Sequence, residues 1–525
     1  MTSVQSYPLA PMPDVPRPSA RVRSPSPFVA AILSAVIPGA GQIYAGRLRR
    51  GRVFLVITGV FVIPAVVLLL MVFYIEGVGL AVTLSRPFFR NPDLLGVLLL
   101  ANAVLLVFRA VAVVDAFLIA RGPSPGGPGR QVASAVMLGL AAILVITALP
   151  HGWVGRRNLL LYDVMTHDFV SDPGQVTTTT APDDGTGTTV PATTGRAPTA
   201  FPSEGRVNLL LMGGDAGVGR TGIRTDSMIV VSIDPETGWT AMFGIPRNLR
   251  RMPVPPDHAI ATFTGGAGTG SSSTTGSTVP WSSCPGCFPA LAWDIYAFGL
   301  EHPELFGGQN SGATAAKTLL GYLLGIEIHY FAIVDLEGFV DIIDAIGGID
   351  ITIPEDLYDP AYPNEDGTTE EKRLSAGAHH LDGHDALFYA RSRQQSDDFN
   401  RMNRQRCVLE ALAEGADPVE LLQGLPAIVP AIEVSVRTDV AIASIPDFLD
   451  LVSKVNTDEI VSIRFMPNAP EFAGTPTSYI AEWTDDGFPI PDRDFIAETV
   501  DTALSLPPLE AIQVLNLQPL EDVCG

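Results

Sequence analysis

Hydrophobic and polar positions divide the chain into parts of very different character. Residues 28–150 are overwhelmingly apolar, whereas residues 172–204 are rich in Thr, Pro and Gly. From residue 205 onward, short apolar runs alternate with polar segments, as in a soluble α/β protein. A Thr/Pro/Gly stretch cannot bury a core, so we expect an extended linker there. The pattern predicts a disordered Pro-rich tail, a membrane region, a linker and a soluble domain at residues 1–27, 28–150, 151–204 and 205–525.

The apolar part contains several runs long enough to cross a bilayer. A hydrocarbon core of ~30 Å needs about 20 apolar residues in a helix. Val53–Ile75, Leu94–Ala120 and Gln131–Pro150 meet that length, and Phe28–Tyr44 is an apolar run interrupted by Pro38–Gln42. We therefore expect three or four spans. The second run contains Arg109 and Asp115, which mark either a functional site or a pairing between helices.

Arginine placement predicts how these spans are oriented. The arginine-rich segments 47–52 and 121–130 should face the cytoplasm, because cytoplasmic loops carry an excess of Arg and Lys. The first long span then runs outward, the second inward and the third outward. Everything after Trp153 is expected outside the cytoplasm, whether or not Phe28–Tyr44 crosses the membrane.

The soluble part shows strand patterns alternating with helix patterns. Val207–Met212, Met228–Ile233 and Trp239–Ile245 are compact apolar runs, and the turn Asp234–Gly238 makes the last two a hairpin. Further strands are predicted at Phe331–Val334, Ile349–Ile353 and Ala386–Ala390, and helices at Ala313–Leu324, Leu336–Ile346 and Met402–Glu414. This order predicts a layered α/β domain with a mixed sheet.

The chain is acidic, with a formal net charge of −23, yet residues 377–405 gather arginines at 391, 393, 401 and 404. Cations clustered in an acidic protein indicate a local anion site, and the guanidinium fork suits bidentate binding of phosphate. Negative charge and an outside location disfavour binding to nucleic acid. Lysine occurs only at 317, 372 and 454, and with many Ala, Gly and Pro this bias indicates a high-GC bacterial source, which we expect to be actinobacterial.

Polar side chains lie at the ends of the predicted strands. Asp215 follows the first strand, Arg224 and Asp226 precede the second, and Arg247 follows the third, while the arginines at 391 and 393 follow a late strand. Open α/β sheets place ligands at such strand ends. Each cluster also has a plain alternative, a surface ion pair or a strand cap. The repetition of arginines at several strand ends favours one shared anion site.

Asp215 and Asp226 are the candidate metal ligands. Adjacent strands could bring the two carboxylates together, and carboxylates beside phosphate-binding arginines suit a magnesium ion that also bridges phosphate oxygens. His379, His380 and His384 form an HH-x-x-x-H pattern without convincing zinc geometry, so we expect these histidines to line a loop.

Four cysteines lie in the soluble part, Cys284, Cys287, Cys407 and Cys524. An even count outside the membrane indicates disulfides, and three pairings are possible. We prefer Cys284–Cys287 with Cys407–Cys524, because the second bridge would tie the C-terminus to a core helix. A second CxxC motif is missing, which disfavours a four-thiolate zinc site.

Several motifs occur in a fixed order between residues 206 and 415. They are NLLLMGGDAG at 208–217, RTDSMIVVSIDPETG at 224–238, IPRN at 245–248, VDLEGFVDIIDAIGGIDITIP at 334–354, GAHHLDGHDALFYARSR at 377–393 and DFNRMNRQ at 398–405. This combination resembles the LytR-CpsA-Psr domain of bacterial cell-envelope phosphotransferases. The resemblance implies an α/β/α sandwich with a central mixed sheet and a hydrophobic channel for a prenyl chain.

The same resemblance implies a membrane-bound, extracytoplasmic enzyme. Such an enzyme transfers a glycopolymer from a polyprenyl-pyrophosphate carrier to peptidoglycan and forms a phosphodiester. By motif position, the pyrophosphate would be held by Arg224, Arg247, Arg391, Arg393, Arg401 and Gln405, with Arg404 in support. Asp215 and Asp226 would bind Mg²⁺ or Mn²⁺, and catalysis would depend mainly on Asp226, Arg391 and Arg393.

Some features depart from this pattern or leave alternatives open. Asn248 stands in IPRN where the family more often has Asp, and residues 264–287 form an unusual insertion. A pyrophosphatase for lipid-linked substrates and a non-catalytic envelope regulator or scaffold are the competing functions. The intact Arg and Asp motifs argue against a scaffold. The glycopolymer itself stays open among arabinogalactan, teichoic acid and capsule.

Overall fold

The computed structural model describes the chain in stretches, and all structural statements concern these residues. They are 25–74, 77–122, 130–166, 201–202, 205–215, 224–263, 284–307, 310–363, 368–392, 398–415, 421–422, 424–425, 428–429, 435–467, 478–517 and 524. The chain divides into two compact units, the first formed by Met1–Met71 with Val97–Asn158 and the second by Val72–Gly96 with Leu159–Gly525. Most of the predicted linker and of the insertion therefore lies outside the described residues.

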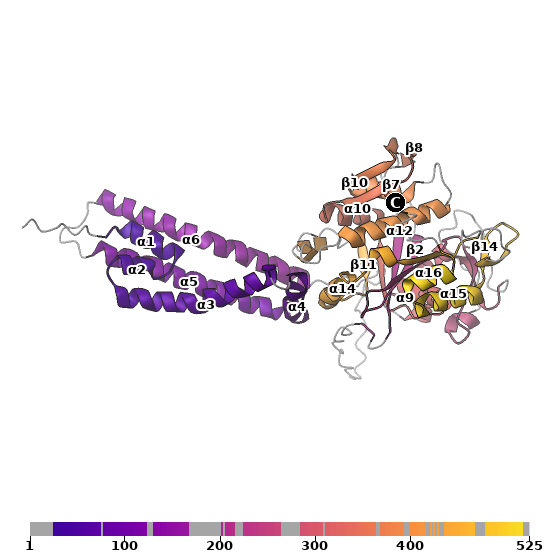
Figure 1. Ribbon diagram of the computed structural model, residues 1–525, viewed down its shortest axis with the longest axis horizontal. Coiled ribbons are helices and arrows are strands. Elements are labelled where there is room, and N and C mark those ends of the chain that lie inside the picture. Colours follow the sequence, from indigo (N-terminus) through magenta and orange to yellow (C-terminus); the bar gives the residue numbers. More distant parts are fainter. Residues whose placement is uncertain are drawn as a thin grey trace, which may run out of the picture. The chain divides into compact units, whose positions relative to one another are not determined.

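The first unit consists of helices (Figure 1). They are α1 (Pro27–Val36), α2 (Ala40–Tyr44), α3 (Leu48–Tyr74), α5 (Asp93–Arg121) and α6 (Arg130–Met165). Within the described residues, two helices are long and apolar enough to cross a membrane, Asp93–Arg121 and Ser134–Met165. The structure thus supports two candidate spans where the sequence predicts three or four. Helix α6 also continues past Pro150, where the predicted membrane region ends.

Polar groups inside this unit are paired between helices. Gln42 is fully buried and donates hydrogen bonds to the carbonyl of Ala112 at 2.9 Å and to Asp115 at 3.3 Å. Arg109 donates to the carbonyl of Ala35. The interhelical pairing expected as one alternative for Arg109 and Asp115 is therefore present. Gly41 makes this packing possible, because an added Cβ would lie 1.9 Å from the carbonyl oxygen of Ala30.

A six-stranded sheet forms the centre of the second unit, in the order β11-β6-β1-β2-β3-β12. Its strands are β1 (Val207–Asp215), β2 (Arg224–Ile233), β3 (Thr240–Gly244), β6 (Tyr330–Val334), β11 (Val436–Thr438) and β12 (Val461–Arg464). Strand β1 pairs parallel with β6, β3 pairs parallel with β12, and the remaining pairs are antiparallel. The predicted mixed sheet is confirmed.

Helices cover both faces of this sheet (Figure 1). In β2, Met228 and Val230 belong to one hydrophobic cluster, and Ile229 belongs to another, because successive side chains of a strand point to opposite faces. The first cluster includes α7 (Ile295–Glu301), α9 (Ser311–Leu324), α15 (Arg493–Ser505) and α16 (Pro508–Val514). The second includes α10 (Leu336–Ala345), α11 (Gly383–Arg391) and α12 (Asp398–Gly415). The α/β/α sandwich is confirmed.

Small elements complete the second unit. Four two-stranded ribbons are β4 with β5 (Arg250–Pro253, Cys287–Leu291), β7 with β10 (Ile349–Ile353, Gly377–Leu381), β8 with β9 (Leu357–Pro363, Thr369–Leu374) and β13 with β14 (Ile480–Trp483, Pro489–Pro491). Short helices are α4 (Gly77–Arg90), α8 (Pro303–Phe306), α14 (Ile445–Val452), η1 (Ala259–Thr262), η3 (Ala292–Asp294), η4 (Ile442–Ser444) and η5 (Thr457–Glu459).

The predicted strand Ala386–Ala390 is wrong, because these residues belong to helix α11. Asp382 caps this helix by accepting a 2.9 Å hydrogen bond from the backbone N–H of Asp385. All five residues 386–390 are buried, so the segment reads as one continuous apolar run. A short buried helix and a buried strand give the same pattern. The other predicted strands and helices named above are present, with small shifts of their bounds.

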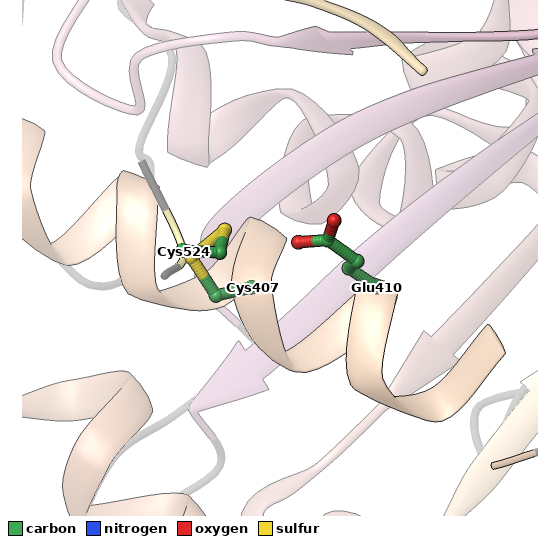
Figure 2. Close-up of side chains that lie close together, drawn as sticks. All are labelled: Cys407, Glu410 and Cys524. Atoms are coloured by element: carbon green, nitrogen blue, oxygen red, sulfur yellow. A yellow bond between two sulfur atoms is a disulfide. The ribbon is translucent and has the colours of Figure 1, made fainter. Parts of the chain in front are cut away.

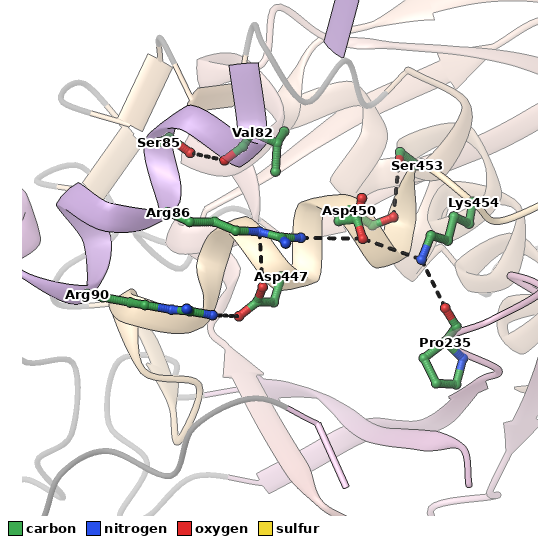
Figure 3. Close-up of polar contacts among 9 residues, drawn as sticks. All are labelled: Val82, Ser85, Arg86, Arg90, Pro235, Asp447, Asp450, Ser453 and Lys454. Atoms are coloured by element: carbon green, nitrogen blue, oxygen red, sulfur yellow. Dashed lines mark hydrogen bonds and ion pairs between the residues drawn. The ribbon is translucent and has the colours of Figure 1, made fainter. Parts of the chain in front are cut away.

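Helix α4 packs on α14 within the second unit (Figure 3). Arg86 forms ion pairs with Asp447 at 3.3 Å and Asp450 at 3.5 Å, and Arg90 lies 3.9 Å from Asp447. Phe89 is 3% exposed and belongs to a hydrophobic cluster with residues of the same unit. Helix α4 is therefore held to the soluble domain by both charge pairing and apolar burial.

The structure contains the disulfide pairing that we prefer, Cys284–Cys287 and Cys407–Cys524. The Cα atoms of Cys407 and Cys524 are 5.3 Å apart, although 117 positions separate the two residues in the chain (Figure 2). Cys407 lies in α12, so the bridge ties the C-terminal end of the chain to a helix of the sandwich. The prediction of both pairs is confirmed.

Candidate active site

A pocket of about 710 Å³ lies between the sheet and the layer of α10, α11 and α12. Its floor comes from β1, β2 and β6, and a further part of its wall comes from β8. Most of the wall is apolar, with side chains that include Leu211, Ile229, Val334, Phe339, Ile342, Leu387, Val408, Leu409 and Leu412. The hydrophobic channel implied by the family resemblance has a counterpart in this pocket.

Charged and polar residues also line the pocket. These are the arginines Arg224, Arg247, Arg391 and Arg401, together with Asp226, Ser227 and Gln405. Six of the predicted site residues, Arg224, Asp226, Arg247, Arg391, Arg401 and Gln405, therefore share one pocket, although they are scattered over 182 positions of the sequence. We call the seven charged and polar lining residues named above, including Ser227, the arginine cluster.

Several different elements position the arginine cluster. Arg224 and Asp226 are the first and third residues of strand β2. Arg247 follows β3, the strand that pairs with β2. Arg391 is the last residue of helix α11. Arg401 and Gln405 lie four residues apart in α12, a spacing that places both side chains on one face of a helix. Convergence of these elements creates the high density of positive charge.

Hydrogen bonds connect the members of the cluster. Arg247 donates through Nη1 to Oδ1 of Asp226, and the two side chains are 16% and 24% exposed. The hydroxyl of Ser227 donates a 3.0 Å hydrogen bond to Oε1 of Gln405, which joins strand β2 to helix α12. The charge-assisted bond between Arg247 and Asp226 holds the guanidinium in a fixed direction. The cluster is therefore ordered by its own contacts.

Arg404 is not among the residues that line the pocket, and its guanidinium donates hydrogen bonds to two backbone carbonyls. It donates a 2.7 Å hydrogen bond to the carbonyl of Tyr389 and another to the carbonyl of Ser392. Burial raises the pKa of Tyr389 to about 12, against an opposing effect of nearby Arg404. These contacts fasten α12 to the end of α11, where Arg391 lies, which agrees with a supporting position for Arg404.

Of the predicted site residues, one is not described by the structure and another is described only in part. Arg393 lies outside the described residues. Asp215 is described by its backbone alone, as the last residue of β1, where it pairs with Arg224 while Gly214 pairs with Thr225. The backbones of Asp215 and Asp226 thus lie near each other on adjacent strands. The approach of the two carboxylates and their role as metal ligands stay predictions.

The residues present are compatible with a magnesium ion at this end of the pocket. Asp226 offers a carboxylate at the pocket surface, and magnesium in phosphate-binding sites commonly takes one or two carboxylates plus phosphate oxygens. Two other acidic residues of the pocket wall are committed to backbone groups. Asp335 accepts from the N–H of Gly338 at 2.9 Å, and Asp359 accepts from the N–H of Ala361 at 3.0 Å. Asp226 is therefore the better candidate.

The histidines do not form a metal site in the described part of the chain. His379 and His380 lie in strand β10 and His384 lies in helix α11, so the expected loop is wrong. His380 hydrogen-bonds through Nδ1 to Asp350 at 2.8 Å, and this bond raises the pKa of the histidine. Elsewhere among the described residues, Cys407, Glu410 and Cys524 lie close together, but both sulfurs are used in the disulfide (Figure 2).

One lining residue was not predicted from the sequence. Trp293 lies in η3, a three-residue 3₁₀ helix outside the predicted elements, and its side chain borders the arginine cluster. A lone Trp in this segment gives no sign of its place in the fold. The recurring arginines could be found because they follow a charge pattern, whereas this indole could not.

Comparison with known proteins supports the motif-based resemblance. Residues 294–482 match the sequence profile of the LytR_cpsA_psr family. The "Polyisoprenyl-teichoic acid--peptidoglycan teichoic acid transferase TagU" of Bacillus cereus (strain AH820) is 29% identical over 236 residues, which cover 44% of this chain and 60% of that protein. The transferase TagV of Bacillus subtilis (strain 168) is 28% identical over 223 residues, 42% of this chain and 46% of that protein. The chain thus matches about half to six tenths of the length of these relatives.

Similar solved structures include the crystal structure of B. subtilis TagV, with 23% identity and a TM-score of 0.38 over 61% of this chain and 100% of that one. Protein gbs0355 from Streptococcus agalactiae is 21% identical, with a TM-score of 0.41 over 60% of this chain and 89% of that one. The relatives named by sequence come from Bacillus, so they give no support to an actinobacterial source. Residues 294–482, together with the ordered motifs, are therefore similar to the LytR_cpsA_psr family.

Proposed function

We propose that this protein transfers a glycopolymer from a polyprenyl-pyrophosphate carrier to peptidoglycan and forms a phosphodiester. The observation that carries the proposal is the composition of the pocket. It combines four arginines with a long apolar wall in a single cavity of about 710 Å³. A polyprenyl pyrophosphate has the same division, since a dianionic head group is attached to an apolar chain.

The names of the relatives support the reaction class. The Bacillus proteins TagU and TagV are named as polyisoprenyl-teichoic acid–peptidoglycan teichoic acid transferases. For this chain, we propose the same kind of donor and acceptor, with the glycopolymer left undefined. The lining of the pocket recognises the pyrophosphate and the prenyl chain, which are common to carriers of different glycans.

The chemistry proposed is a substitution at phosphorus. A hydroxyl of peptidoglycan attacks the phosphorus that carries the glycan, the bond to the bridging oxygen breaks, and polyprenyl phosphate leaves. Phosphoryl transfer of this kind depends on positioning and charge neutralisation. Arg224, Arg247, Arg391 and Arg401 would neutralise the phosphate oxygens as negative charge shifts to the leaving group. Arg393 joins this set by its motif position alone.

Asp226 has two possible contributions in this scheme. Its carboxylate would help to hold a magnesium or manganese ion, with Asp215 on the neighbouring strand, and the ion when bound would neutralise phosphate charge. The carboxylate could alternatively accept the proton of the attacking hydroxyl. The ion pair with Arg247 fixes the direction of the carboxylate, which both contributions require.

We further propose that the catalytic domain lies outside the cytoplasm, on a chain with several spans. Two observations support this topology. Arginine-rich segments flank the apolar helices in the pattern expected for cytoplasmic loops. Helix α4 follows α3, precedes α5 and contacts α14 of the catalytic domain through Arg86 and Asp447 (Figure 3). The connection between α3 and α5 would therefore lie on the same side as the domain.

A transfer assay tests the proposal. The full chain in detergent is incubated with a short glycan on a polyprenyl pyrophosphate, peptidoglycan fragments and Mg²⁺, and the products are identified by mass spectrometry. We expect a peptidoglycan-linked glycan phosphate and free polyprenyl phosphate. Release of glycan phosphate without attachment would identify a pyrophosphatase instead. Absence of both products, with an intact donor, would favour a scaffold.

A further inference from the structure

Trp293 connects strand β2, which carries Arg224, to the segment after β3, which carries Arg247. Its backbone N–H donates a 3.1 Å hydrogen bond to the carbonyl of Arg247. Its own carbonyl accepts a 3.3 Å hydrogen bond from the hydroxyl of Thr225, which follows Arg224 in β2. These two bonds attach the short helix η3 to both segments at once. The indole is thus placed by backbone contacts that come from the same segments as the arginines.

The indole ring lies beside two guanidinium groups. The Cζ atom of Arg247 is 5.0 Å from the ring centroid, and the Cζ atom of Arg224 is 5.8 Å from it. Both distances fall within the range in which a cation is attracted by the negative face of an aromatic ring, and Trp is the most effective partner. One side chain therefore attracts two cations that repel each other.

Acidic neighbours reduce this repulsion. Asp226 forms an ion pair with Arg247. Asp294, next to Trp293 in the chain, lies close enough to Arg224 to interact with it electrostatically, although burial raises the pKa of Asp294 overall. Each arginine thus has an acidic group near it and shares the indole with the other. Such an arrangement holds flexible side chains in place before an anion binds.

We propose that Trp293 is a positioning residue that holds Arg224 and Arg247 in the orientation needed to bind the pyrophosphate of the donor. The inference rests on the proposed function and adds to it a residue that acts through two arginines. An arginine that is already ordered loses less conformational entropy when it binds a ligand. Removal of the indole should therefore weaken binding of pyrophosphate more than it changes the stability of the fold.

The test compares Trp293→Leu, which removes the ring face, with Trp293→Phe, which keeps a smaller one. Dissociation constants for inorganic pyrophosphate are measured by calorimetry on the full chain, and donor KM and kcat are measured in the transfer assay. We expect the Leu variant to bind roughly tenfold more weakly, with the Phe variant in between. Donor KM should rise by a similar factor. Equal affinity in the wild type and the Leu variant would overturn the inference.

A matched control uses another arginine–tryptophan pair, whose residues directly precede strands β1 and β3. The Cζ atom of Arg206 lies 4.3 Å from the ring centroid of Trp239, and neither residue lines the pocket. Trp239→Leu should leave pyrophosphate affinity unchanged. A loss equal to that of Trp293→Leu would mean that the effect is a general response of the sheet, and the positioning role would be rejected.

A double-mutant cycle separates positioning from direct contact. In an Arg247→Ala background, Trp293→Leu should weaken pyrophosphate binding by a much smaller factor, because one of its two partners is already absent. The same factor in both backgrounds would refute action through Arg247. If Leu lowers the melting temperature strongly, the Phe variant is used in the same cycle.

Binding of pyrophosphate and transfer of glycan give separate answers. If the wild type binds pyrophosphate but transfers no glycan, the proposed function fails while the role of Trp293 is still tested by affinity. If transfer occurs and Trp293→Leu changes neither affinity nor donor KM, the positioning role fails and the proposed function stands.

Discussion

Arg247 and Asp226 form an ion pair across two neighbouring strands of the pocket. Arg247 follows β3 and Asp226 lies in β2, and the antiparallel pairing of these strands brings the residues together across 21 positions of sequence. The pair does more than balance charge. It places a carboxylate that can serve a metal or a proton beside a guanidinium that can hold a phosphate, at one point of the pocket wall.

Replacing Asp226 by Asn should strongly lower transfer and weaken its dependence on magnesium. The amide keeps the size of the side chain but loses the negative charge that a metal or a base requires. Rates are measured against magnesium concentration in the transfer assay. Glu236→Gln, at an exposed turn position, serves as the control for charge removal. An unchanged magnesium dependence in a folded Asp226→Asn protein would exclude the metal role.

Arg391→Ala should nearly abolish transfer, because a charge-assisted bond to a desolvated phosphate is lost. Arg391→Lys should restore little, since one ammonium cannot reproduce the bidentate fork. Arg373, which stacks on Tyr358 at 4.8 Å outside the pocket, provides a matched control, and Arg373→Ala should retain activity. The same comparison applies to Arg393→Ala. A wild-type rate in Arg391→Ala would leave the phosphate role of this residue without support.

Loss of the Cys407–Cys524 bridge should destabilise the soluble domain. The bridge spans 117 positions, and closing so long a loop contributes about 4–5 kcal/mol in the chain-entropy model. Denaturant unfolding of Cys524→Ser measures the difference. Cys287→Ser, which opens a bridge of separation 3, should cost clearly less. Non-reducing peptide mapping identifies the pairs, and free thiols at both 407 and 524 in exported protein would contradict the prediction.

Gly383→Ala should destabilise the packing of α11 on α10. A Cβ at this position would lie 2.4 Å from the carbonyl oxygen of Val340 and 2.8 Å from its Cα, and both are backbone atoms that cannot rotate away. We expect a loss of about 1–3 kcal/mol and a lower transfer rate, since α11 carries Arg391. Gly415→Ala meets no atom within 4 Å and is the control. Equal stability of the two variants would contradict the packing argument.

The topology is tested by labelling and by reporter fusion. A reporter that is active only outside the cytoplasm should be active when fused near residue 170, after the last apolar helix. Thr83→Cys, on an exposed position of α4, should react with a membrane-impermeant maleimide in whole cells. An inactive reporter near 170, or protection of Cys at 83 until the cells are broken, would overturn the proposed arrangement.

The sequence alone determined the parts of this protein that depend on local patterns. Compact apolar runs in β1, β2 and β3 reveal strands, because a short apolar run bounded by turn residues is typical of a strand buried on both faces. The arginines of the cluster stand out because their charge contrasts with the acidic chain. Their order within a set of motifs also indicated the family. These features can be recognised in the sequence because each depends on residue types and short motifs.

The tertiary structure decided what depends on contacts between distant segments. Helix α11 has the same continuous apolar run as a buried strand, and only its burial from several sides explains that run. The even number of cysteines allowed three pairings, and the 5.3 Å approach of the Cα atoms of Cys407 and Cys524 selects one. Trp293 gained its position beside Arg224 and Arg247 from η3 packing on two strands. Such contacts produce no local pattern in the sequence, because they form only when folding brings residues from distant segments together.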